Sequence, residues 1–188
     1  MNDPKAQAFS TIFLDRDGVL NRKLPEGEYV SSWERFELLP GVAQAIAQLN
    51  RAGLLVLVVT NQRGVALGRY SAADVESIHA RLQQTLALSG AHIDAFYFCP
   101  HDKQSCRCRK PLTGMFDRAL RDFPHIQPAT SLMVGDSLSD IEFGRAAGMR
   151  TLFILGEAEH RKPGWERAAS LATTTATTLP AAIPLILA

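Results

Sequence analysis

Three short apolar runs, each ending directly in polar residues, constrain the fold of this chain more than any other feature of its sequence. Residues 11–14 (TIFL) end at Asp15, residues 54–59 (LLVLVV) end at Thr60, and residues 131–134 (SLMV) end at Gly135-Asp136. Short runs rich in β-branched residues are typical of strands that are buried on both faces. We therefore expect these three runs to lie in the interior of a sheet.

Segments with helical spacing alternate with the runs. The spacing predicts helices over residues 41–52, 71–89, 113–123 and 137–147, and further strands over 95–98 and 151–155. This alternation is typical of a three-layer α/β fold, a parallel sheet with helices on both faces. Residues 173–178 form either an edge strand or a loop, and residues 179–187 form a short helix despite Pro184. We expect one domain spanning residues 1–188.

Charge and hydropathy exclude several classes of partner. The chain has 20 basic and 19 acidic residues, a formal net charge of +1. Such a balance creates no field that attracts nucleic acid or an anionic membrane. No stretch approaches the ~20 apolar residues of a membrane span, and residues 1–10 do not resemble a secretory signal. We expect a cytoplasmic monomer that acts on a small molecule.

The polar residues at the strand ends form one candidate site, because ligands collect at the carboxyl ends of the strands in open α/β sheets. Asp15 and Asp17 follow the first strand, and Thr60 ends the second. Lys110 follows a cysteine-rich loop, and Asp136 follows a later strand. Each one alone has an ordinary explanation, such as a solvated turn, a surface charge or a helix cap. Their occurrence in this order favours a catalytic site.

The residue types at this site suit phosphoryl transfer. A carboxylate nucleophile, Asp15, needs a cation to cancel its repulsion from the phosphate, and oxygen ligands from Asp15, Asp17 and Asp136 suit Mg²⁺. Asp15 attack forms an aspartyl-phosphate, and Asp17 acts as the acid and then the base. Thr60 and Lys110 stabilise the phosphoryl oxygens. Asp140 orients either Lys110 or a metal-bound water.

A second metal site is predicted in the cysteine-rich loop. Four possible zinc ligands lie within ten residues: Cys99, His101, Cys106 and Cys108. Three thiolates and one imidazole are the ligand set of a closed tetrahedral Zn²⁺ site, which is structural rather than catalytic. The alternative is three free cysteines beside a surface histidine. Because Arg109 and Lys110 follow Cys108 directly, a folded loop also positions their side chains at the pocket rim.

Four motifs along residues 11–155 resemble those of the haloacid dehalogenase-like phosphatases. They are Phe13-Leu14-Asp15-Arg16-Asp17-Gly18, Thr60-Asn61-Gln62, Arg109-Lys110-Pro111 and Val134-Gly135-Asp136. The resemblance implies a Rossmann-like sheet and an Asp15 nucleophile. It also implies Mg²⁺ at Asp15, Asp17 and Asp136, and a phosphoryl-binding site that includes Thr60, Asn61, Gln62 and Lys110.

The cysteine loop narrows the resemblance to two zinc-containing branches without a large cap domain, the heptose bisphosphate phosphatases and the histidinol-phosphate phosphatases. Residues 21–40 and 63–71 are likewise too short to hold such a domain. The first branch implies removal of the 7-phosphate from D-glycero-D-manno-heptose 1,7-bisphosphate, with Arg109 recognising the substrate. The alternative substrate is histidinol phosphate or another small phosphate ester. A remoter alternative is a zinc-stabilised nucleic-acid-binding module.

Several residues keep two interpretations at this stage. Arg63 and Arg69 either bind a second phosphate of the substrate or are ordinary surface arginines. The aromatic pair Trp33 and Phe36 lines the pocket or belongs to the core. We expect the histidines at positions 79 and 92 to lie on the surface without a role.

Overall fold

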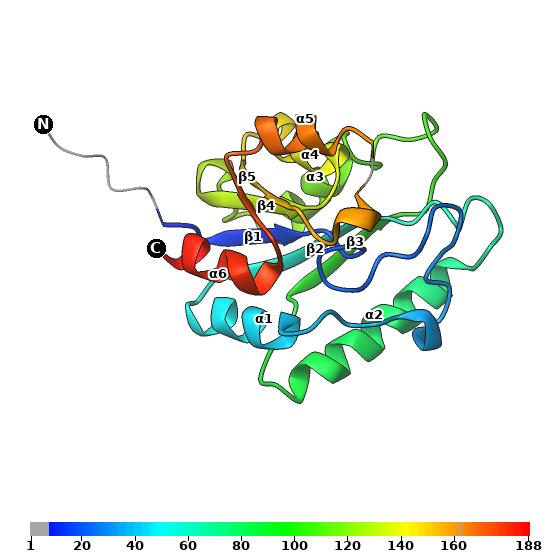
Figure 1. Cartoon of the computed structure of the whole chain (residues 1–188), viewed down its shortest axis with the longest axis horizontal. Coiled ribbons are helices and arrows are strands. Elements are labelled where there is room, and N and C mark those ends of the chain that lie inside the picture. Colours follow the sequence, from blue (N-terminus) through cyan, green and yellow to red (C-terminus); the bar gives the residue numbers. More distant parts are fainter. Residues whose placement is uncertain (1–7, 162) are drawn as a thin grey trace, which may run out of the picture.

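The computed structural model describes residues 8–161 and 163–188, and its centre is one six-stranded parallel sheet. The strand order is β3-β2-β1-β4-β5-β6, and each neighbouring pair is parallel (Figure 1). The strands are β1 (Thr11–Leu14), β2 (Leu55–Asn61), β3 (Ala95–Cys99), β4 (Ser131–Gly135), β5 (Arg150–Ile154) and β6 (Thr174–Ala176).

The first strand of the sequence is central in the sheet. β1 pairs with β2 on one side and with β4 on the other, so that Leu14 lies between Val58 and Val134. Ile12 and Leu14 pack into one hydrophobic cluster and Phe13 into another, as the two-residue period of a strand requires. Both faces of β1 are therefore covered, which explains why its run is apolar without alternation.

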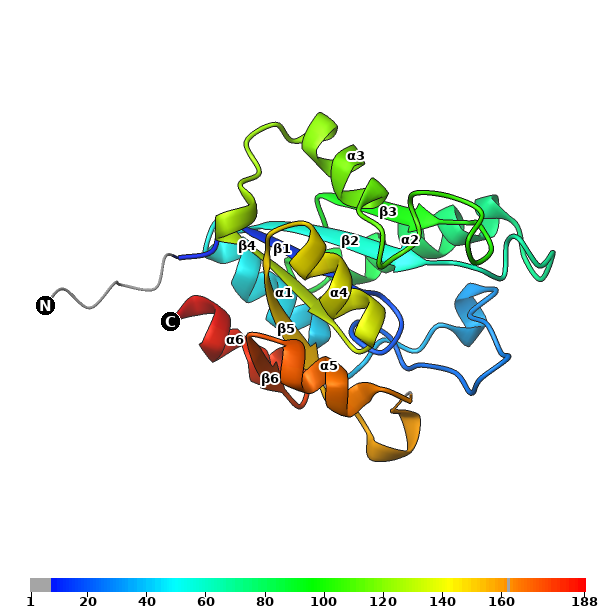
Figure 2. The same ribbon diagram turned by 90° about the horizontal axis from the view of Figure 1, so that it is seen from above.

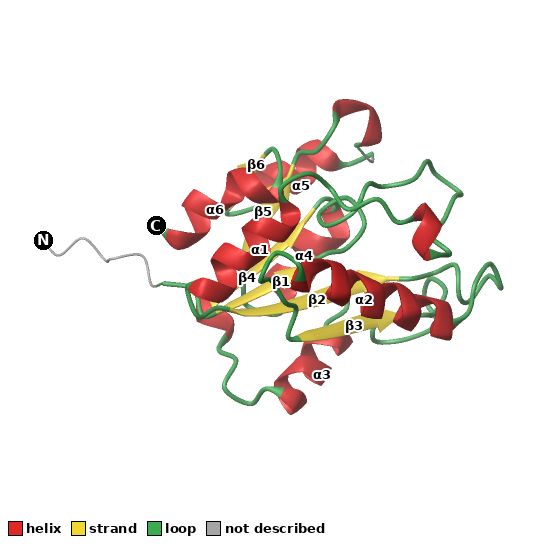
Figure 3. Cartoon of the chain, turned by 90° about the horizontal axis from the view of Figure 1, so that it is seen from below, coloured by secondary structure: helices red, strands yellow, loops and turns green. Residues whose placement is uncertain are grey.

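Helices cover the two faces of the sheet. The helices α1 (Val42–Arg51), α2 (Ala72–Ala87) and α6 (Leu179–Leu187) lie on one face (Figure 3). On the other face lie α3 (Gly114–Asp122), α4 (Leu138–Ala146) and α5 (Trp165–Leu171) (Figure 2). Short 3-10 helices span Trp33–Arg35, Pro128–Thr130 and Ala158–His160. The predicted three-layer α/β fold is confirmed.

The helix ends agree with the sequence signals that predicted them. Ser71 caps α2: its Oγ atom accepts a hydrogen bond from the Asp74 backbone N–H, and the Asp74 carboxylate accepts one from the Ser71 backbone N–H, which together form a capping box. Residues 173–178 contain the edge strand β6, and α6 forms with Pro184 inside it. Helix α5 is missing from the prediction, because its seven residues span only two turns and bury a single residue, Ala168.

The connections near the carboxyl ends of the strands are short. Residues 15–41, between β1 and α1, contain only the 3-10 turn Trp33–Arg35, and residues 62–71 contain no helix or strand. The absence of a large cap domain is thus confirmed for these segments. No helix within residues 8–161 and 163–188 is long and apolar enough to cross a membrane.

Candidate active site

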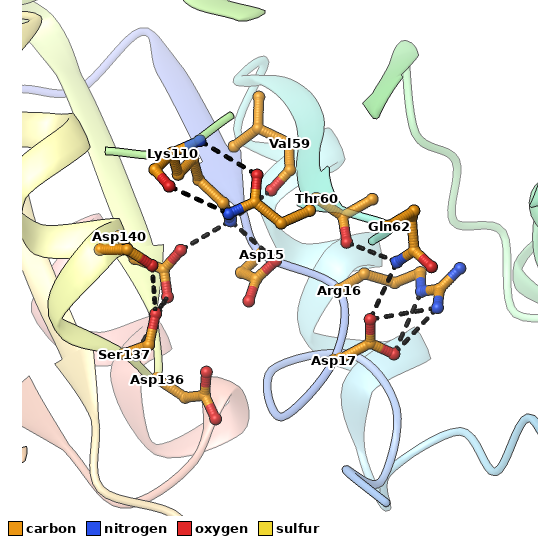
Figure 4. A network of polar contacts seen from close by, with 12 residues as sticks. Asp15, Arg16, Asp17, Val59, Thr60, Gln62, Lys110, Asp136, Ser137 and Asp140 are labelled. Atoms are coloured by element: carbon orange, nitrogen blue, oxygen red, sulfur yellow. Dashed lines mark hydrogen bonds and ion pairs between the residues drawn. The ribbon is translucent and has the colours of Figure 1, made fainter. Parts of the chain in front are cut away.

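A buried ion-pair cluster lies where β1 ends. The Lys110 Nζ atom lies 2.8 Å from Asp15 Oδ1 and 2.6 Å from Asp140 Oδ1, and it donates to the Val59 carbonyl at 2.7 Å. Asp15 is 8% exposed and Lys110 only 3%. Figure 4 shows Asp15 and Lys110 between Asp140 on one side and Asp17 on the other. Four segments distant in sequence therefore meet at one point.

Burial and charge act in opposite directions on this pair. Desolvation raises the pKa of Asp15 to about 7, against the attraction of the Lys110 ammonium, while the other carboxylates add to the rise. Burial works to lower the pKa of Lys110, but the charges of Asp140 and Asp15 outweigh it and raise that pKa. Lys110 is therefore a fixed positive charge beside Asp15.

Asp17 lies within a shell of donors. Arg16 Nη2 donates to its two oxygens at 2.9 and 3.1 Å, Asn21 Nδ2 donates at 3.0 Å, and Gln62 Nε2 donates at 3.0 Å. Burial works to raise the pKa of Asp17, but the Arg16 charge and these hydrogen bonds outweigh it and lower that pKa. The carboxylate form of Asp17 is favoured.

The three polar residues at the end of β2 have different partners. Gln62 Nε2 also donates to Thr60 Oγ1 at 2.8 Å, and Tyr70 donates to Gln62 Oε1 at 2.7 Å. Asn61 instead makes two hydrogen bonds to the backbone of Lys110, at 3.0 and 3.1 Å. The amide of Asn61 thus holds the loop that carries Lys110, whereas Thr60 and Gln62 face the cavity beside Asp17.

Three carboxylates converge at the ends of β1 and β4. Oxygens of Asp15, Asp136 and Asp140 all lie within 4.8 Å of one another. Lys23 forms an ion pair with Asp136, and this lysine is absent from the sequence prediction. A cluster of hard oxygen donors fits Mg²⁺. Gly18 lies directly against Asp136: a Cβ atom at this position, where φ is +98°, would lie 2.2 Å from an Asp136 oxygen.

A cavity of about 730 Å³ is lined by Asp15 and Asp140 of this cluster, whereas Asp136 lines a second cavity. Nine of the site residues predicted from the sequence line the first cavity: Asp15, Asp17, Thr60, Asn61, Gln62, Arg63, Arg109, Lys110 and Asp140. Arg63 lies at the rim in an ion pair with Asp102, whereas Arg69 is exposed and does not line this cavity. Arg109 Nη1 is buried without a hydrogen-bond partner among the described residues.

The cysteine-rich loop brings its four ligand atoms together. The three Sγ···Sγ distances between Cys99, Cys106 and Cys108 are 3.1–3.5 Å, and His101 Nδ1 lies 3.2 Å from Cys108 Sγ. Tetrahedral Zn²⁺ with bonds of about 2.3 Å requires sulfur atoms somewhat under ~4 Å apart. The donor set and its spacing fit zinc.

The structure also shows where His79, Trp33 and Phe36 lie. His79, predicted on the surface, is buried, and its ring stacks on Phe96 with centroids 4.5 Å apart. The prediction for His79 is wrong because this position of α2 faces the sheet. Phe36 is a buried core residue, and Trp33, which is partly buried, stacks on its ring with centroids 5.1 Å apart. Neither residue lines the cavity.

Comparison with known proteins identifies the family. A family model described as HAD-hydrolase-like matches residues 107–180. The D-glycero-beta-D-manno-heptose-1,7-bisphosphate 7-phosphatase of Escherichia coli K12 is 36% identical over 186 residues, 95% of each chain. This chain belongs to the heptose 1,7-bisphosphate 7-phosphatase family of HAD-like hydrolases. The D-glycero-alpha-D-manno-heptose-1,7-bisphosphate 7-phosphatase of Mycobacterium bovis is 50% identical over 132 residues, 70% of this chain and 69% of the relative.

Solved structures of the heptose 1,7-bisphosphate phosphatase family share this fold. The D,D-heptose 1,7-bisphosphate phosphatase of B. bronchiseptica, complexed with magnesium and phosphate, superposes with a TM-score of 0.82 at 31% identity, covering 95% of this chain and 98% of the other. The enzyme from Burkholderia thailandensis gives a TM-score of 0.67 at 30% identity over 95% and 99%. The resemblance found in the sequence motifs is confirmed.

Proposed function

We propose that this chain is a Mg²⁺-dependent phosphatase that removes the 7-phosphate of D-glycero-D-manno-heptose 1,7-bisphosphate through an aspartyl-phosphate on Asp15. The observation that carries the proposal is the meeting of Asp15, Lys110 and Asp140 with Asp17 and Thr60 beneath one cavity. Family membership supports the reaction class and the heptose substrate.

Magnesium fits the carboxylate cluster. The ligands would be the carboxylates of Asp15 and Asp136 and the backbone carbonyl of Asp17, and the ion supplies positive charge against the phosphoryl oxygens. Lys110, which contacts Asp15 directly, supplies further positive charge. The Asp15 carboxylate is then able to approach a phosphate ester despite its own charge.

The residues of the chain account for both halves of the reaction. An Asp15 oxygen attacks phosphorus while the bond to the sugar oxygen breaks, and Asp17 gives that oxygen a proton. Water then attacks the aspartyl-phosphate, Asp17 takes a proton from it, and phosphate leaves. The donor shell of Asp17 favours the base form. The nearby anionic ester favours the protonated form that the first half needs.

Arg109 supports a substrate with two phosphates. Its Nη1 atom is buried beside the cavity without a partner among the described residues, whereas Arg63 already contacts Asp102. A buried guanidinium nitrogen without a partner is costly, and a phosphate oxygen satisfies it. We therefore assign the distal phosphate to Arg109 and a supporting role to Arg63.

We also infer that Cys99, His101, Cys106 and Cys108 hold a structural Zn²⁺. The four ligand atoms already lie within 4.8 Å of one another.

Thiolates persist in a reducing compartment, which supports a cytoplasmic location. One sheet extends through the described residues, which supports a single domain over residues 1–188. We propose that the enzyme is a monomer. Because its net charge is only +1, we also propose that it binds neither nucleic acid nor an anionic membrane.

The test is parallel phosphate release from heptose 1,7-bisphosphate and histidinol phosphate with Mg²⁺. We expect faster turnover of the bisphosphate, with the anomeric phosphate retained in the product by ³¹P NMR. Asp15→Asn should abolish turnover, while Asp117→Asn on α3 should retain it. Faster turnover of histidinol phosphate would support the second branch, and an active Asp15→Asn enzyme would refute the aspartyl-phosphate.

A further inference from the structure

Arg16 is a buried cation that the proposed chemistry does not use. Its side chain is 1% exposed and is the largest of the fully buried side chains. It stands between Asp15 and Asp17 in the chain, two residues after the end of the buried strand β1. Arginine is rarely buried to this extent unless it is paired. We therefore expect Arg16 to be paired with a negatively charged group.

The partner is the Asp17 carboxylate. Arg16 Nη2 lies 2.9 Å from Oδ1 and 3.1 Å from Oδ2, and Nε lies 3.3 Å from Oδ1 (Figure 4). Asn21 and Gln62 each add one hydrogen bond to a different oxygen of the same group. Because both oxygens are held from more than one direction, the orientation of the carboxylate is determined.

The guanidinium is itself held in place. Its central carbon lies 5.9 Å from the centroid of the Phe36 ring, a buried core residue. The Arg16 carbonyl accepts hydrogen bonds from the backbone of Leu20 at 2.8 Å and Asn21 at 3.2 Å, which fixes the turn that carries both Arg16 and Asp17. A planar arginine guanidinium packed against the core can therefore fix the orientation of its partner, whereas the flexible ammonium of a lysine would not.

We propose that Arg16 is a positioning residue that acts through Asp17 and sets the direction in which its carboxylate faces the cavity. This inference rests on the acid and base roles given to Asp17 in the proposed function. The Arg16 side chain borders the cavity but is only 1% exposed, and its Nε and Nη2 atoms already contact Asp17. Only Nη1 has no hydrogen-bond partner among the described residues, so the contacts of Arg16 are made to Asp17. Its effect on turnover must therefore vanish when Asp17 no longer transfers protons.

A double-mutant cycle tests this dependence with heptose 1,7-bisphosphate as substrate. Loss of a positioned acid and base reduces kcat by about 10²–10⁴-fold, so we expect such a loss in Asp17→Asn. We expect about a 100-fold loss in Arg16→Met, with KM within about threefold of the wild type. The double variant should be no slower than Asp17→Asn alone. Arg22→Met, which removes a nearby and more exposed guanidinium, should retain the wild-type kcat.

Two results would overturn the proposal. One is wild-type turnover in Arg16→Met, and the other is a double variant that shows the product of the two single losses. If circular dichroism shows that Arg16→Met is unfolded, Arg16→Lys decides the question. A folded Arg16→Lys with kcat at least about tenfold lower at unchanged KM supports positioning, and an unchanged kcat refutes it. Full activity of Asp17→Asn would instead overturn the role of Asp17 itself, and this inference with it.

Discussion

Lys110 holds more of the candidate site together than any other single side chain. Its ammonium has three partners, the carboxylates of Asp15 and Asp140 and the carbonyl of Val59. An ammonium has three donors, so no hydrogen is left for a further contact without rearrangement. The residue therefore combines two tasks: it offsets part of the negative charge of two buried carboxylates, and it supplies charge beside the proposed nucleophile.

Replacing Lys110 should damage both stability and turnover. In Lys110→Met the carboxylates of Asp15 and Asp140 remain buried without their cation. Breaking a buried ion pair by removing one partner costs about 3–5 kcal/mol. We expect a loss of this size in the free energy of unfolding from urea titration, and at least about a 100-fold loss of kcat.

A matched variant separates burial from charge. Lys103→Met removes an exposed lysine of the same chain, and exposed substitutions change stability by only about 0.5 kcal/mol. Equal destabilisation by the two variants would contradict the importance of the buried pairing.

Sequence reasoning found the chemical groups of the site better than their surroundings. The positions of Asp15, Thr60 and Asp136 directly after apolar runs were enough to predict that they share one edge of the sheet. The burial of Arg16 and His79 was not predictable, since it depends on partners contributed by other segments. An arginine between two aspartates at the end of a buried strand was the one available indication for Arg16.

At the scale of elements, the cysteine loop is joined at three places to the last residue of β2 and the two residues after it. Gln62 N donates to the Cys99 carbonyl at 2.8 Å, Asn61 pairs with the Lys110 backbone, and Arg63 contacts Asp102. The conformation of the loop is therefore coupled to the position of Lys110. Loss of the loop structure should reach the site through these contacts.

Removal of one zinc ligand tests this coupling. We expect Cys106→Ser to bind less than one zinc per chain by elemental analysis and to lose turnover, because the loop no longer holds Lys110 in place. Ser105→Ala changes the neighbouring side chain without removing a ligand and should keep both zinc and turnover. Zinc loss with unchanged turnover would show that the loop and the site are independent.

Helix α2 carries a histidine whose burial makes stability depend on pH. Burial, together with the Arg16 charge, lowers the pKa of His79 to about 3, from 6.5 for an exposed histidine. Between these values the unfolded chain binds a proton that the folded chain does not, so acid favours unfolding. The contribution of His79 to stability is complete above pH 6.5 and decreases as the pH falls toward 3.

The variant His79→Phe should weaken this pH dependence. Phenylalanine keeps a ring on Phe96 and has no group to protonate. The wild-type free energy of unfolding should fall more steeply than that of the variant between pH 6.5 and 5, by at most about 1.4 kcal/mol per pH unit. Urea titrations at several pH values measure both slopes. Parallel slopes would mean that His79 is protonated alike in the folded and unfolded chains.

At the scale of the whole molecule, the parallel sheet collects carboxylates that repel one another. Asp15 comes from the end of β1, and Asp136 and Asp140 follow β4. The alternation of strands and helices predicted this arrangement correctly, because a parallel sheet places all carboxyl ends at one edge. The short helix α5 escaped prediction, since two turns give too little periodicity.

Magnesium should therefore stabilise the folded chain. A ligand that binds only the folded state adds about 2.7 kcal/mol at a concentration of 100 Kd, and we expect Tm to rise by several degrees. Asp136→Asn should remove most of this rise, whereas Asp117→Asn on α3 should preserve it. Thermal unfolding with and without Mg²⁺ measures the effect. An equal rise in all three proteins would indicate binding elsewhere.

The central position of β1 in the sheet has a consequence for the order in which the chain folds. The strand β1, which ends just before Asp15, pairs with β2 on one side and with β4 on the other, and β4 lies about 120 residues later in the chain. A ribosome must therefore complete most of the polypeptide before any nascent molecule is able to turn over substrate. In refolding experiments, recovered catalysis should mark the arrival of the long-range topology rather than of local helices.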